Sequence, residues 1–203
     1  MCGSGESLAL YKVRLAMLPP IPPWEGFHPI VVHYPIALLT MAPVFLILGA
    51  LWKAQSRAMF LAYVLMLAAG TATAFIATAT GEASEHVVQI PGVAEQALER
   101  HEDLGELARN LFLALTIVAG ITAGLYWSLH ARAKRGVIAV GALIMLMLHG
   151  AAALVLANAA HEGGRLVHEF GVRAPIVSAA AGTTSKSEDT RHERDEPDDN
   201  IAR

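Results

Sequence analysis

The chain carries, from Phe27 to Trp52, the stretch FHPIVVHYPIALLTMAPVFLILGALW, which contains no Asp, Glu, Lys or Arg. A helix needs about 20 such residues to cross the hydrocarbon core of a bilayer. Three further uncharged stretches of similar length follow, at 58–80, 110–130 and 136–161. Four long apolar segments are rare in a soluble domain, so the sequence predicts an all-α, integral membrane four-helix bundle in contact with the lipid bilayer.

The predicted four-span domain covers residues 27–172. Residues 1–26 form a Pro-rich leader whose consecutive prolines exclude regular helix, and residues 173–203 are expected to be a disordered polar tail. Apolar side chains recur at helical spacing over residues 93–110, which predicts a short amphipathic helix before the third span. No internal repeat is evident. The four spans are expected at about 29–52, 59–80, 110–129 and 137–160.

Two features of the spans bear on how the helices pack. Pro43 lies inside the first span, where it should kink the helix and free a carbonyl toward a neighbouring helix. Small residues dominate 68–74 and 150–153. Such runs let helices approach closely in lipid, and they would equally leave room for a flat cofactor.

The composition excludes several function classes. Only 16% of the residues are charged, against about 25% in soluble domains, and no basic patch supports nucleic-acid binding. The single cysteine, Cys2, excludes an internal disulfide and a CxxCH haem attachment site. No HExxH motif, nucleophile elbow or phosphate loop is present, so nothing indicates a self-contained enzyme.

The loops between the spans differ in charge. Lys53 and Arg57 lie in the first loop, and Arg132, Lys134 and Arg135 lie in the third. The middle loop, 81–110, is instead rich in acidic residues. Under the positive-inside rule, we expect the bacterial cytoplasmic (inner) membrane, with the first and third loops in the cytoplasm and both termini on the periplasmic side.

Six of the nine histidines are expected at the periplasmic rim. Histidine is the commonest protein ligand of metals, so the rim is a candidate metal or haem site. We expect His33, His101 and His161 to be the ligands, with His28 and His168 next. Five helical steps point the side chains of His28 and His33 in different directions, so both cannot face one centre. His33 is preferred because it lies deeper in the span. His101 is included because it lies on the apolar face of the amphipathic helix.

Three functions remain open for these histidines. Two facing imidazoles would suit a bis-histidine haem b that transfers electrons. Three or four, with carboxylates nearby, would suit the binding or handling of copper, zinc or iron. Alternatively, no cofactor is bound, and the imidazoles form hydrogen bonds with loops or a partner in a structural or assembly subunit.

Three motifs resemble those of an uncharacterised bacterial membrane family, domain of unknown function 2231. The stretch FHPIVVHYPIAL at 27–38 is similar to the family's HPxxVHFPIAL, HEDLG at 101–105 to HxxLG, and HEGGRLVH at 161–168 to HxGGxLxxH. The resemblance covers about residues 24–172 and implies four spans with histidines at one face. Members are often joined to Rieske or c-type cytochrome domains. Because this chain has neither type of cysteine motif, the resemblance implies a separate cytochrome or Rieske-type redox partner.

Overall fold

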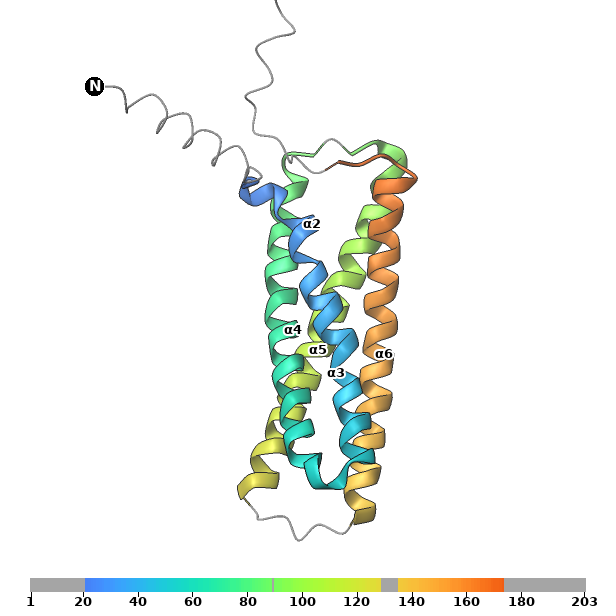
Figure 1. Cartoon of the computed structure of the whole chain (residues 1–203). Coiled ribbons are helices and arrows are strands. Elements are labelled where there is room, and N and C mark those ends of the chain that lie inside the picture. The colour runs from blue at the N-terminus through green and yellow to red at the C-terminus, as the bar shows by residue number, and fades with distance from the viewer. Residues whose placement is uncertain (1–20, 89, 129–134, 174–203) are drawn as a thin grey trace, which may run out of the picture. The chain divides into compact units, whose positions relative to one another are not determined.

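The computed structural model describes residues 21–88, 90–128 and 135–173, and over these residues every regular element is a helix. Four long helices form the body of the domain, and each runs antiparallel to the next along the chain (Figure 1). The elements are η1 (Trp24–Gly26), α2 (His28–Val31), α3 (His33–Leu51), η2 (Lys53–Gln55), α4 (Ser56–Glu85), η3 (Gly92–Ala94), α5 (Glu95–Ser128) and α6 (Arg135–His168).

The predicted all-α bundle of four apolar helices is confirmed. Helices α4, α5 and α6 extend beyond the spans expected at 59–80, 110–129 and 137–160, because polar segments at their ends continue the same helices. The first span is instead divided at Val32 into α2 and α3. The expected amphipathic helix and the third span form one continuous helix, α5. Most of the predicted leader and nearly all of the predicted tail lie outside the described residues.

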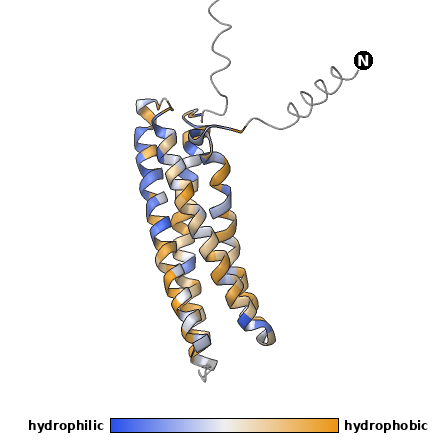
Figure 2. Ribbon diagram, turned by 90° about the vertical axis from the view of Figure 1, so that its left-hand side faces the viewer, coloured by the Kyte–Doolittle hydropathy of each residue, from blue (hydrophilic) through white to orange (hydrophobic). Residues whose placement is uncertain are grey.

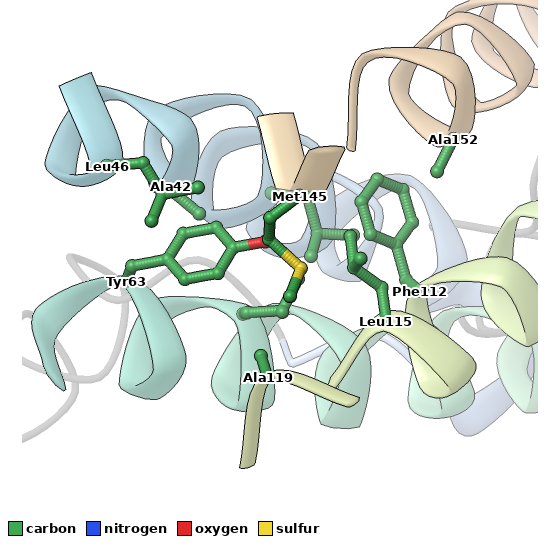
Figure 3. Packing of buried hydrophobic residues seen from close by; sticks show 10 residues of the cluster. Ala42, Leu46, Tyr63, Phe112, Leu115, Ala119, Met145 and Ala152 are labelled. Atoms are coloured by element: carbon green, nitrogen blue, oxygen red, sulfur yellow. The ribbon is translucent and has the colours of Figure 1, made fainter. Parts of the chain in front are cut away.

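The core lies between the four helices at mid-height. Tyr63 from α4 and Phe112 from α5 are its largest fully buried apolar side chains, and the labelled residues in Figure 3 approach one another from all four helices. Many large apolar side chains point outward instead, including Met147 and Leu154 of α6. Figure 2 shows hydrophobic residues predominating along the middle of the helices, as expected for a surface in contact with lipid tails.

Gly70 explains one of the runs of small residues. A Cβ atom at this position would lie 2.7 Å from both Cγ and Cδ2 of Leu39 in α3. Leu39 is fully buried, so its side chain has little room to move away. The run at 68–74 therefore permits close packing of α4 on α3 at this point.

A buried histidine satisfies the carbonyl that Pro43 leaves free. Proline has no N–H to donate to the carbonyl four residues earlier, which is that of Leu39. His149 Nε2 of α6 lies 2.8 Å from this oxygen, and Tyr63 Oη lies 3.3 Å from His149 Nδ1. A carbonyl only accepts, so Nε2 carries the proton and Nδ1 accepts from the tyrosine hydroxyl. The freed carbonyl therefore bonds to a neighbouring helix, as expected.

The two helical hairpins, α3–α4 and α5–α6, bury side chains at corresponding positions, although no repeat is evident in the sequence. The buried residues of α3 each have a buried counterpart in α5, 73 residues later: Pro35, Leu39, Ala42 and Leu46 correspond to Ala108, Phe112, Leu115 and Ala119. Five buried residues of α4 have buried counterparts in α6, 82 residues later: Tyr63, Leu67, Gly70, Ala77 and Thr80 correspond to Met145, His149, Ala152, Ala159 and Glu162.

Candidate cofactor site at the histidine end

His28 is the first residue of α2, and its side chain is hydrogen-bonded to α4. Pro29 follows it at the start of α2, where proline's missing N–H costs no helical hydrogen bond. His28 Nδ1 lies 2.8 Å from the carbonyl oxygen of Ala77. The imidazole also lies against Gly81, where a Cβ atom would be 3.1 Å from His28 Cε1. The glycine thus makes room for the ring one helical turn beyond the carbonyl.

His101 is anchored on α6 in the same way. It lies on the inward face of α5, as the apolar stripe predicts, and its Nδ1 is 2.8 Å from the carbonyl oxygen of Ala159. A Cβ atom at Gly163 would lie 2.8 Å from His101 Cε1. Carbonyl and glycine are again one helical turn apart, so both histidines are held by the same pair of features.

These hydrogen bonds determine the tautomer of each ring. The carbonyl oxygens of Ala77 and Ala159 accept but do not donate, so the Nδ1 atoms of His28 and His101 carry the protons. In the neutral ring, Nε2 then keeps its lone pair. Histidines that bind metals usually donate their other ring N–H to a carbonyl or carboxylate in this manner. Both rings are therefore prepared to act as ligands through Nε2.

The imidazoles of His28 and His101 lie against each other, edge to face. Their ring centroids are 6.1 Å apart and their planes are inclined by 86°. Two imidazoles bound to opposite sides of one metal ion, each at a metal–nitrogen distance of about 2 Å, have centroids about 6 Å apart. The separation of His28 and His101 would therefore suit two ligands on opposite sides of one metal ion.

The other histidines of the rim lie elsewhere. His33, His86, His161 and His168 are exposed, and their side chains form no hydrogen bond, ion pair or ring contact within the described ranges. Of the five histidines expected as ligands, the structure therefore brings together His28 and His101. Across the same ranges, no group of three or more His, Cys, Asp or Glu side chains is placed to hold a metal ion.

Charged side chains lie beside the site on α6. Glu162 is buried next to Gly163, and it forms an ion pair of 2.8 Å with Arg165 and one of 3.9 Å with Arg100 of α5. Arg165 also pairs with Glu169 at 3.0 Å. The buried carboxylate is thus compensated, and this network fixes the end of α6 against the segment of α5 that carries His101.

The comparisons with known proteins bear on the family alone. No curated protein and no solved structure matches the chain. Residues 25–175 match the family described as "Predicted membrane protein (DUF2231)". This match includes all four long helices and both paired histidines. Because it covers most of the chain and agrees with the three sequence motifs, the protein belongs to the DUF2231 family of membrane proteins.

Proposed function

We propose that this membrane protein binds one haem b between His28 and His101 and transfers electrons to or from a separate cytochrome or Rieske-type protein. The observation that carries the proposal is the paired geometry. Both rings have their Nδ1 atoms bonded to carbonyls at 2.8 Å, and their centroids are separated by 6.1 Å. Each Nε2 is then available as an axial ligand of iron.

The ligand count favours haem over a single copper, zinc or iron ion. Such ions generally take three or four ligands from the protein, whereas the described residues bring only two imidazoles together. A porphyrin supplies four nitrogens itself and needs only the two axial ligands. If His28 and His101 both held the iron, no position would remain open for a substrate, which would suit electron transfer.

The first test is the visible spectrum of the full chain, purified in mild detergent from haem-replete cells. We expect a Soret band that shifts on dithionite reduction, with sharp α and β bands and one iron per chain by metal analysis. A colourless sample with one copper or zinc per chain would replace haem with a metal-handling role. A colourless, metal-free sample would overturn both readings.

One observation favours a second candidate, a structural or assembly subunit. The hydrogen bonds of His28 to Ala77 and of His101 to Ala159 join separate helices, so the imidazoles would stabilise the bundle without a cofactor. In that case, replacing them would change stability or partner binding and no spectrum would be present.

We propose that the histidine end faces the periplasm of a bacterial inner membrane. The basic residues of the first loop lie at the opposite end of the helices from the histidine pair (Figure 1), and the positive-inside rule places such loops in the cytoplasm. In a Cys2→Ser background, we expect a membrane-impermeant maleimide to label Glu99→Cys in intact spheroplasts and Gln55→Cys only after lysis. The reverse pattern would invert the orientation.

A further inference from the structure

We infer that the domain is a duplicated helical hairpin, and that the cofactor lies on the approximate two-fold axis that relates the two hairpins. This inference rests on the proposed function. It adds that His28 and His101 are equivalent ligands, and that Gly81 and Gly163 are the positioning residues that set the orientation of their rings.

The first support is that the histidines and their contact residues are separated by the same numbers of residues as the buried core positions of the two hairpins. His101 lies 73 residues after His28, the same step that relates the buried residues of α3 and α5. Their acceptors, Ala77 and Ala159, are 82 residues apart, the step that relates α4 and α6. Gly81 and Gly163 share that step as well. Packing and polar contacts thus repeat together.

The contacts between the helices have the same symmetry. Helix α3 packs on α4 as α5 packs on α6, and the bundle closes through α4 with α5 and α3 with α6. Exchanging the two hairpins leaves this set of contacts unchanged, as a two-fold axis parallel to the helices requires.

A two-fold axis explains why His28 and His101 can bind the same cofactor. A residue and its counterpart lie at equal distances from the axis, so two counterparts can meet only close to it. With their centroids 6.1 Å apart, the rings of His28 and His101 lie about 3 Å from their midpoint. A metal held equally by both Nε2 atoms would be equidistant from them, as every point on the axis is.

The glycines determine where each ring lies. A methyl group at Gly163 would come within 2.8 Å of His101 Cε1, and one at Gly81 within 3.1 Å of His28 Cε1. The separation at Gly163 is shorter than Cβ atoms normally allow, so the His101 ring must shift. The separation at Gly81 is a tight contact, so the His28 ring must move by a few tenths of an ångström. Either movement would disturb the hydrogen bond of the ring to its carbonyl. Gly164 offers a matched control in the same helix, because a Cβ atom there would have no neighbour within 4 Å.

The test uses the haem-loaded full chain and compares wild type with Gly163→Ala, Gly81→Ala and Gly164→Ala. Because the ring planes are inclined by 86°, the wild-type ferric protein should give the highly anisotropic low-spin electron paramagnetic resonance signal of perpendicular axial imidazoles. We expect Gly163→Ala and Gly81→Ala to shift this signal and to weaken haem retention by about 10–100-fold, as loss of ligand support generally does. Gly164→Ala should match wild type.

The outcomes separate the inference from the function on which it rests. A haem protein in which Gly163→Ala and Gly81→Ala leave the signal unchanged would overturn the inference and leave the function intact. A signal from parallel imidazoles would do the same. A protein with no haem would overturn both. A shift in both glycine variants, absent in Gly164→Ala, would support two equivalent ligands on the axis.

Discussion

Replacing His101 with Asn is expected to remove the haem spectrum while leaving the fold intact. An asparagine amide can place an N–H donor near the position of Nδ1, and so can keep the bond to the Ala159 carbonyl, which is 2.8 Å in the wild type. It has no nitrogen in the place of Nε2. Haem affinity should fall by more than about 100-fold, equivalent to over 2.7 kcal/mol, and His28→Asn should behave alike.

This substitution separates the ligand role from the role of joining helices. Haem content per chain, the Soret position and the midpoint of thermal unfolding would be measured on the same samples. His33→Ala and His161→Ala provide controls, because both side chains are exposed. If these controls lost the haem and His28→Asn kept it, the ligands would be the set expected from the sequence, with His33 and His161 in place of His28. An unchanged spectrum in His101→Asn and His28→Asn would exclude this pair.

The fold could be predicted from the sequence because the lipid environment strongly restricts the structures that can span a membrane. In lipid, a spanning segment must satisfy its own backbone groups, which leaves a helix of about 20 apolar residues as the simplest solution. Four such segments therefore predicted four helices, and the structure has them. The ends of the helices were less predictable. Polar residues next to the apolar segments belong to the same helices: residues 81–85 continue α4 after the second segment, and residues 95–109 begin α5 before the third.

The site was harder to predict because it depends on contacts between distant segments. Helical spacing correctly separates the directions of His28 and His33, but it does not indicate which one meets His101. His28 is placed by its hydrogen bond to the Ala77 carbonyl and by its packing against Gly81, contacts with α4 that helical spacing does not reveal. The 73-residue step from His28 to His101 and the 82-residue step from Gly81 to Gly163 were a readable signal. They became meaningful once the buried residues of α3 and α5 showed the first step and those of α4 and α6 the second.

His149 is fully buried in the middle of the bundle, and its replacement by Leu is expected to destabilise the bundle rather than change the cofactor site. The variant would leave the Leu39 carbonyl and the Tyr63 hydroxyl without the partners they have at 2.8 and 3.3 Å. A buried polar group without a partner costs about 1–3 kcal/mol, and hydrogen bonds within membranes measure toward the lower end of that range. Thermal unfolding in detergent, or unfolding by a denaturing detergent, would measure the loss.

The second substitution in this experiment is Pro43→Ala, which tests why the histidine is needed. Alanine restores an N–H four residues after Leu39, so the helix itself can satisfy the carbonyl. We expect His149→Leu to cost much less in a Pro43→Ala background than in wild type, a non-additivity typical of residues that share one partner. If the two changes were simply additive, the freed carbonyl would not be the reason for His149. If His149→Leu removed the haem spectrum from a folded protein, the ligand would lie in the middle of the membrane. The pairing of His28 with His101 would then need another explanation.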